Sequence, residues 1–218
     1  FEDEHCVIPE GMEEKFAVLP EEYSHLYLAI DGKLAAVICI HDPIRQEAFP
    51  VINSLKRAGI SKVVMMTGDS ERTARAVAAQ IGVDEYYSEV LPEDKAGFVE
   101  REKAAGRKVI MIGDGINDSP ALSAADVGIA ISDGAELARE IADVTIGADN
   151  LYEIVTLKAI SNGLMKRIHK NYRSIILINA GLIALGVLGV LPPATSALLH
   201  NTSTLLISLK SMQNLLPE

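Results

Sequence analysis

Residues 113–122 decide the fold of this chain, and they read Gly-Asp-Gly-Ile-Asn-Asp-Ser-Pro-Ala-Leu. Two carboxylates, Asp114 and Asp118, stand four residues apart beside the amide of Asn117. Oxygen ligands of this kind suit Mg²⁺, which retains water molecules and bridges to phosphate oxygens. The alternative is an ordinary Gly-Asp-Gly turn, in which Asp118 only caps a helix that begins near Pro120.

The segments around this stretch alternate between strand-like and helix-like patterns. Strands are predicted at 26–30, 34–40, 62–66, 108–112, 127–131 and 144–146, and helices at 47–57, 71–81, 92–105 and 135–141. Asp31-Gly32 lies between the first two strands and predicts a tight hairpin. The alternation is typical of an α/β fold, here a Rossmann-like parallel sheet with helices on both faces.

Polar residues follow two of the predicted strands. Thr67-Gly68-Asp69 comes directly after the strand 62–66, and Gly113-Asp114-Gly115 comes after the strand 108–112. Open parallel sheets bind their ligands at the carboxyl ends of the strands. Both segments are therefore candidates for a binding site.

The last part of the chain has a different character. Residues 174–191 carry no charge, Pro192-Pro193 interrupts the run, and 194–209 is again uncharged if His200 is neutral. At about 1.5 Å per residue, the first run could span most of a ~30 Å hydrocarbon core. We expect a two-helix transmembrane hairpin with both ends in the cytoplasm, because basic residues precede it and Lys210 follows it. A buried hairpin in a soluble protein is the alternative.

Composition excludes some classes of protein. The chain has 218 residues and a net charge of −10, which argues against a nucleic-acid surface. Cys6 and Cys39 are its only cysteines and form no disulfide framework, so a reducing cytosolic setting is favoured. The chain starts at Phe1 with an acidic stretch and without Met, so we expect a fragment with no signal peptide.

Four motifs together resemble those of P-type ATPases, a branch of the haloacid-dehalogenase-like superfamily. Residues 113–122 resemble the hinge motif of that family, and Thr67-Gly68-Asp69 matches its Thr-Gly-Asp. Asp42-Pro43-Ile44-Arg45 looks like its Asp-Pro-x-Arg, and Pro92-Glu93-Asp94-Lys95 matches the segment that brings a lysine to the phosphate. All four occur in the family's order, so the resemblance covers roughly residues 26–146.

The resemblance implies a role for each matched residue. Asp114 and Asp118 would bind or orient Mg²⁺, and Asn117 would contact the phosphoryl group. Thr67 would donate a hydrogen bond to that group, and Lys95 would neutralise charge on its oxygens.

The same resemblance assigns the nucleotide-facing side and the hinge. Asp69, which follows Gly68 in the catalytic Thr-Gly-Asp motif, would act there together with Asp42 and Arg45. The implied cofactors are Mg²⁺ and ATP.

One part of the family's pattern is absent. P-type ATPases are phosphorylated at the Asp of Asp-Lys-Thr-Gly-Thr, which does not occur in this sequence. The resemblance implies that residues 1–24 end a nucleotide-binding domain, that 25–150 form a phosphorylation domain without its first strand, and that 151–218 form a linker helix and the membrane hairpin. The chain alone is then expected to be inactive.

Two membrane helices after the hinge domain resemble the heavy-metal-transporting subgroup. The candidate ligands for the transported ion are Asn179, His200, Asn201, Ser203 and Thr204. Imidazole, amide and hydroxyl groups suit borderline divalent ions such as Zn²⁺, Co²⁺ or Mn²⁺. Asn179 could instead make only a helix–helix hydrogen bond, and His200 could lie at the membrane surface.

The expected function is therefore a part of an ATP-driven transition-metal cation transporter, a multi-pass membrane protein with a cytoplasmic catalytic domain. Its expected partners are the lipid membrane, a transported metal ion (divalent favoured) and the rest of the same polypeptide. Two alternatives stay open: a membrane-anchored haloacid-dehalogenase-like phosphatase and a catalytically dead regulatory fragment. The phosphatase would require a nucleophilic Asp-x-Asp near its first strand, which the sequence lacks.

Overall fold

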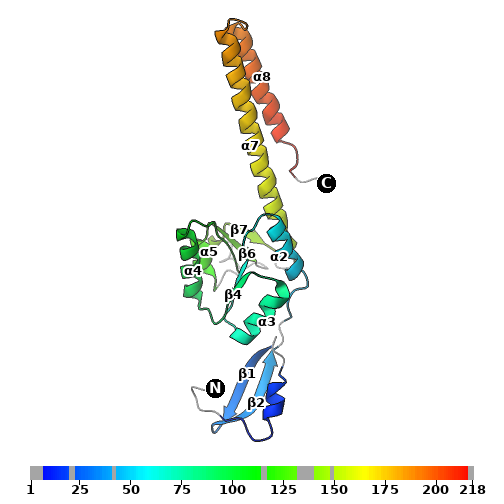
Figure 1. Ribbon diagram of the computed structural model, residues 1–218, viewed down its shortest axis with the longest axis vertical. Helices are drawn as coiled ribbons and strands as arrows, with labels where there is room; N and C mark the ends of the chain where they lie inside the picture. Colours follow the sequence, from blue (N-terminus) through cyan, green and yellow to red (C-terminus); the bar gives the residue numbers. More distant parts are fainter. Residues whose placement is uncertain are drawn as a thin grey trace. The chain divides into compact units, whose positions relative to one another are not determined.

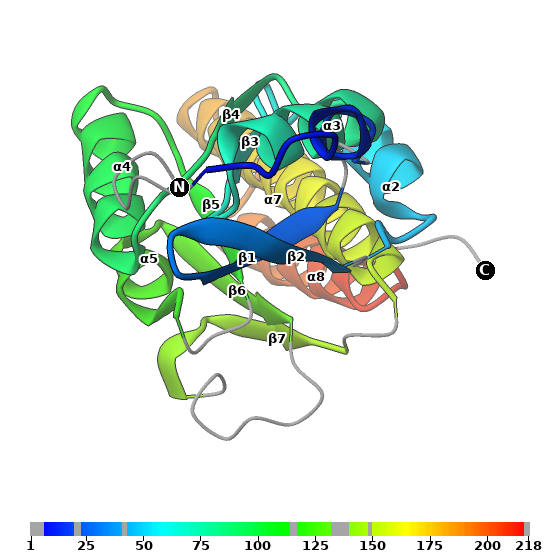
Figure 2. The same ribbon diagram turned by 90° about the horizontal axis from the view of Figure 1, so that it is seen from below.

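The computed structural model describes residues 7–19, 23–40, 43–113, 117–131, 140–147 and 150–215. The chain divides into two compact units, Phe1–Ile154 and Val155–Glu218. Figures 1 and 2 label most of the helices and strands of both.

The first unit begins with a short helix, α1 (Glu13–Ala17), and an antiparallel hairpin of β1 (Ser24–Ile30) and β2 (Lys33–Ile40). The hairpin turn has positive φ at both central positions, 49° at Asp31 and 73° at Gly32. A tight two-residue turn with the twist of β-strands requires this conformation, so the predicted hairpin is confirmed. Helix α1 has no counterpart among the predicted elements.

The rest of the first unit alternates helices and strands. These are α2 (Ala48–Arg57), β3 (Val64–Met66), α3 (Glu71–Ile81), β4 (Glu85–Tyr87), α4 (Pro92–Ala104), β5 (Ile110–Gly113), α5 (Ser119–Ala124), β6 (Val127–Ile131) and β7 (Val144–Ile146). The predicted parallel pairing is confirmed, since β3 pairs with β4 and β6 pairs with both β5 and β7. Strand β4 was not predicted, and most of the helix expected at 135–141 lies outside the described residues.

The parallel strands form two groups where one continuous sheet was expected. Among the described residues, β3–β4 and β5–β6–β7 are separate sheets, and no hydrogen bonds join β3 to β5. Periodicity identifies a strand but not its neighbours, so the sequence pattern could not reveal this division.

Local signals explain where the helices begin and end. Ser70 accepts a hydrogen bond from the backbone N–H of Thr73 at the start of α3. Gly82 ends the same helix in the left-handed conformation, at φ 74°. Helix α4 begins with Pro92, whose fixed φ and missing N–H are tolerated in the first turn.

A small core holds the elements next to residues 113–122. It consists of Val99 from α4, Met111 from β5, and Ala121 and Leu122 from α5. Helices α4 and α5 lie side by side in Figures 1 and 2. Strand β6 passes so close to α5 that a Cβ at Gly128 would lie 2.7 Å from the Leu122 carbonyl oxygen. This packing fixes both ends of the loop that follows β5.

The second unit is a hairpin of two helices. Helix α7 (Tyr152–Val187) reaches it from the first unit and is followed by α8 (Pro193–Ser211). The predicted break is confirmed, because α7 ends at Val187 and α8 begins at Pro193. Within the described part of the chain, no helix is both long enough and apolar enough to cross a membrane.

Polar contacts close the open end of this hairpin. The Arg167 guanidinium on α7 donates to the backbone carbonyls of Ser211, Gln213 and Asn214, at 2.6 to 2.9 Å. Asn171 donates from Nδ2 to the Ser211 hydroxyl at 2.7 Å. The Arg167 charge stabilises carbonyls at the C-terminus of α8, where the helix has no partners of its own.

Candidate functional site

An ion pair joins two of the four sequence motifs. The Lys95 ammonium donates to Oδ1 of Asp118 at 2.7 Å, and the two side chains are only 15% and 12% exposed. Lys95 lies in the first turns of α4, and Asp118 stands directly before α5. Asp118 makes no side-chain capping hydrogen bond. The interpretation of Asp118 as a mere helix cap is therefore wrong.

Gly113 lies very close to the Asp118 side chain. A Cβ at Gly113 would lie 2.3 Å from Oδ2 of Asp118 and 2.6 Å from its Cβ, far inside van der Waals contact. The end of β5 thus has to be glycine for the Asp118 carboxylate to reach Lys95. A glycine at the end of a predicted strand indicates close approach at this position, and the structure identifies the Asp118 side chain as the neighbouring group.

The Thr67-Gly68-Asp69 segment forms a tight loop at the carboxyl end of β3. The Thr67 hydroxyl donates to Oδ2 of Asp69 at 2.7 Å, and the Asp69 backbone N–H donates to Thr67 Oγ1 at 3.1 Å. The segment after β4 is bonded to this loop, because the backbone N–H groups of Glu89 and Val90 donate to the Asp69 and Thr67 carbonyls. That segment runs on into α4, the helix that carries Lys95.

The remaining site residues take separate positions. Asn117 is exposed at the turn before α5. Arg45 precedes α2 and lies 3.9 Å from a carboxylate oxygen of Glu47. Asp42 and Asp114 lie outside the described residues. Within the part of the chain that the structure describes, no three His, Cys, Asp or Glu side chains are grouped as metal ligands.

Two of the candidate ion ligands meet across the helical hairpin. Nδ1 of His200 on α8 lies 2.8 Å from Oδ1 of Asn179 on α7. The hydroxyls of Ser203 and Thr204 donate to the His200 carbonyl, at 2.8 and 3.0 Å. Asn201 is exposed.

The family model of haloacid dehalogenase-like hydrolases matches residues 2–126, which include all four motifs. The chain belongs to this family.

Relatives of this haloacid dehalogenase-like chain include metal-transporting ATPases. A manganese-exporting P-type ATPase of Mycobacterium bovis is 40% identical over 84% of the chain and 26% of its own length. Copper-transporting ATPase 1 of Rhizobium meliloti is 44% identical over 81% of the chain and 21% of its own length. The chain therefore spans about a quarter of the length of these curated relatives.

A solved structure extends the similarity to both units. The crystal structure of a zinc-transporting PIB-type ATPase in the E2·Pi state is 28% identical and superimposes with a TM-score of 0.74. The match covers 94% of this chain and 34% of the other. The three similar proteins carry the names of three different metals, so their names do not select one for this chain.

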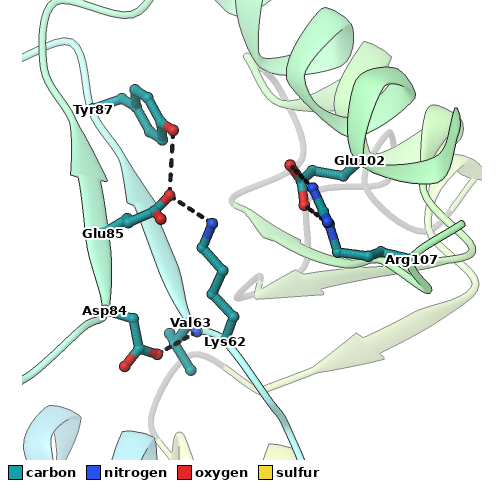
Figure 3. A network of polar contacts seen from close by, with 7 residues as sticks. All are labelled: Lys62, Val63, Asp84, Glu85, Tyr87, Glu102 and Arg107. Atoms are coloured by element: carbon teal, nitrogen blue, oxygen red, sulfur yellow. Dashed lines mark hydrogen bonds and ion pairs between the residues drawn. The ribbon is translucent and has the colours of Figure 1, made fainter. Parts of the chain in front are cut away.

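The opposite end of the strands carries charged pairs that the sequence analysis missed. Figure 3 shows Lys62 and Tyr87 both bonded to Glu85, and Arg107 paired with Glu102 at the end of α4. The bond to Glu85 raises the pKa of the Lys62 ammonium. The Arg107 guanidinium lowers the pKa of Glu102.

Two aspartates at this amino end have matching roles in this haloacid dehalogenase-like fold. Asp84 stands before β4 and accepts from the Val63 N–H and the Lys56 ammonium, both at 2.7 Å. Asp126 stands before β6 and accepts from the Val109 N–H and the Lys108 ammonium, both at 2.9 Å. These bonds hold the pKa of each carboxyl below its ordinary value, with Lys56 the largest cause for Asp84 and Val109 for Asp126.

The sequence holds a signal for these clamps. An aspartate directly precedes three of the parallel strands. The third of these, Asp143, stands before β7 and accepts a hydrogen bond from the Gly128 N–H at 2.8 Å. Each one accepts from a backbone N–H at the start of the preceding strand: Val63 directly before β3, Val109 directly before β5, and Gly128 within β6. An aspartate one residue before a parallel strand is therefore compatible with such a bond, although the same pattern also fits an ordinary turn.

Proposed function

We propose that this chain is part of an ATP-driven transition-metal cation transporter, a P-type ATPase, and that its first unit stabilises an aspartyl-phosphate intermediate. The observation that carries the proposal is the shielded pair of Lys95 and Asp118. It joins the Pro-Glu-Asp-Lys segment to residues 113–122 at the carboxyl ends of the strands. A positioned cation and a nearby carboxylate are the groups that phosphoryl transfer with Mg²⁺ uses.

Lys95 and Asp118 are proposed to act in two states. Without a phosphoryl group, the Lys95 ammonium neutralises the Asp118 carboxylate. With one, the ammonium stabilises the charge on the phosphoryl oxygens. Asp118 fits Mg²⁺ because it offers hard carboxylate oxygen at a position where glycine allows close approach, and Asp114 would be a second ligand. Bound Mg²⁺ would supply further charge neutralisation.

The other motif residues are proposed to complete the site. Thr67 and Asn117 would donate hydrogen bonds to the phosphoryl group. The Thr67–Asp69 hydrogen bond keeps the loop that contains Gly68 in one conformation before the substrate binds. Asp42 and Arg45 would belong to the nucleotide-facing side and the hinge, where ATP binds.

The phosphorylated Asp is proposed to belong to a strand outside this sequence. β3 and β5 carry the two carboxyl-end loops of the site, and the described residues show no pairing between them. A strand that pairs with both would bring its own carboxyl end between Thr67 and Asp118. This assignment makes 25–150 a phosphorylation domain without its first strand and 1–24 the end of a nucleotide-binding domain. The chain alone would then not hydrolyse ATP.

Residues 151–218 are proposed to form the linker helix and a membrane hairpin. Many large apolar side chains of α7 and α8 are exposed, among them Ile176, Leu177, Ile183, Leu198, Leu205 and Leu206. Lipid and neighbouring helices of the same polypeptide would cover them. The first unit would then lie in the cytoplasm, and the transported divalent ion would use His200, Asn201, Ser203 and Thr204, with Asn179 beside them.

The first experiment is to sequence the reading frame upstream of Phe1. The proposal requires Asp-Lys-Thr-Gly-Thr and further membrane helices there. A natural start close to Phe1 would overturn the transporter for this chain and favour the regulatory alternative.

The second experiment measures metal-stimulated phosphoenzyme formation by the longer polypeptide with radiolabelled ATP. Lys95→Ala should lower the phosphorylation rate by roughly 100-fold or more, as removal of an oxyanion-stabilising group does. Asp118→Ala and Asp114→Ala should abolish the phosphorylation that Mg²⁺ supports. Lys108→Ala is the matched control, because Lys108 pairs with Asp126 but is 88% exposed at the opposite end of the strands. Equal rates for Lys95→Ala and Lys108→Ala would contradict the proposed site.

A further inference from the structure

The contact between Asn179 and His200 indicates which imidazole nitrogen has a lone pair available for a cation. Nδ1 of His200 lies 2.8 Å from Oδ1 of Asn179. An amide oxygen only accepts hydrogen bonds, so Nδ1 has to carry the hydrogen. A neutral imidazole with the hydrogen on Nδ1 has its lone pair on Nε2.

We propose that Asn179 is a positioning residue that holds His200 in the Nδ1–H tautomer, so that Nε2 is the atom that binds the transported cation. The inference rests on the proposed transport function and deepens it. It replaces Asn179 as a direct ligand with Asn179 as the partner of a ligand. A hydrogen bond from the second nitrogen to an acceptor fixes the ring orientation of metal-binding histidines and raises their basicity.

The residues that follow His200 support a cation site on the same face of α8. Ser203 and Thr204 are three and four residues further on, the spacing that places side chains on one face of a helix. Both hydroxyls donate to the His200 carbonyl, so their hydrogens are already engaged and their oxygens offer lone pairs. One imidazole nitrogen with hydroxyl oxygens suits a borderline divalent ion better than Cu⁺, which prefers thiolate and thioether sulfur.

The test uses the full 218-residue chain in lipid nanodiscs, with ¹⁵N-labelled histidine. Long-range ¹H–¹⁵N spectra distinguish the two tautomers, and loss of one signal set in His200→Gln assigns His200 among the five histidines. In the wild type we expect the Nδ1–H tautomer at mildly alkaline pH. Added Zn²⁺ should then shift Nε2 and not Nδ1.

Substitutions of Asn179 separate positioning from direct binding. Asn179→Leu should produce a mixture of tautomers and weaken Zn²⁺ binding by roughly 10- to 100-fold, the usual cost of losing such a partner. Asn179→Asp keeps an acceptor and should restore the Nδ1–H tautomer. Asn171→Leu is the matched control, because Asn171 also bonds across the hairpin, to Ser211, but lies away from His200.

The outcomes distinguish the inference from the function on which it rests. A wild-type chain that shows the Nε2–H tautomer, or an Asn179→Leu variant with unchanged tautomer and Zn²⁺ affinity, would overturn the inference while leaving transport possible. A Zn²⁺ shift at Nδ1 would also overturn it. Absence of any Zn²⁺ effect on His200 in a hairpin with the expected tautomer would instead overturn His200 as part of an ion site.

Discussion

The two ends of the parallel strands carry the same kinds of residue in opposite settings. At the carboxyl end, the Lys95 and Asp118 side chains are 15% and 12% exposed. At the amino end, Lys108 is paired with Asp126 although its own side chain is 88% exposed. Both are lysine–aspartate pairs with nearly the same separation, 2.7 and 2.9 Å. Only the surroundings differ.

We infer that this difference separates the pair proposed to act on a phosphoryl group from one that serves the fold alone. Exposed ion pairs contribute little to stability, and salt screens them. Such a pair can be retained where its aspartate also satisfies a backbone N–H. In a shielded pair, the free-energy cost of removing both charges from water is about as large as the gain from their attraction. Two apolar side chains of similar size would therefore stabilise the fold equally well. The presence of Lys95 and Asp118 inside the packed end is therefore better explained by a charged substrate than by stability.

The largest effect is expected when the shielded pair is broken. Lys95→Ala leaves the Asp118 carboxylate shielded and unpaired, which should lower the free energy of unfolding by about 3 kcal/mol near neutral pH. The chain contains no Trp, so urea unfolding would be followed by far-UV circular dichroism. Lys108→Ala should change the same quantity far less. If both variants lose equal stability, the contrast between the two ends is wrong.

A smaller loss is expected when Gly113 is substituted. Gly113→Ala places a methyl group 2.3 Å from Oδ2 of Asp118, so the carboxylate has to move away from Lys95. We expect a destabilisation of about 2 kcal/mol, typical of overpacking. Gly106→Ala is the comparison variant. An added Cβ at Gly106 would meet no atom within 4 Å, so this substitution has the backbone strain of a φ of 81° without any overpacking. If Gly113→Ala retains full stability and an unchanged Lys95 environment by NMR, the steric role of Gly113 is wrong.

Local elements could be predicted from the sequence because their signals are local. Helix α3 begins and ends where Ser70 and Gly82 indicate, and Asp31-Gly32 marks the hairpin turn. Strand β4 was missed because Glu85–Tyr87 is short and carries a charge. Neither the separation of β3–β4 from β5–β6–β7 nor the closeness of Gly113 to Asp118 has a local signal. The first depends on which strands become neighbours, and the second on the packing of a side chain against the backbone five residues away.

The contacts among the candidate site residues were not predicted from the sequence. The motif resemblance selected Lys95 and Asp118, which the structure brings together across two helices. It did not predict that they pair with each other, nor that Thr67 bonds to Asp69. The clamps at Asp84 and Asp126 escaped notice because an aspartate before a strand also fits an ordinary turn.

The smallest effect, and the one that tests the amino end, is a change in pH dependence at Asp126. The Val109 N–H and the Lys108 ammonium hold the pKa of Asp126 below its ordinary value. The unfolded chain therefore binds the proton more tightly, so this contribution to stability is present above about pH 4, the ordinary value, and is lost as the pH falls through the folded-state pKa. Asp126→Asn should thus be less stable than the wild type near neutral pH, with a difference that shrinks on acidification.

Urea midpoints across the acidic range would measure this difference. Lys108→Met provides the control, since it removes the ammonium and keeps the bond from the Val109 N–H, which is the larger cause. We expect Lys108→Met to lose less of the pH dependence than Asp126→Asn. If the two variants behave alike, the Lys108 ammonium rather than the Val109 N–H is the main cause of the lowered Asp126 pKa. The amino end would then depend on an ion pair, as the carboxyl end does with Lys95 and Asp118.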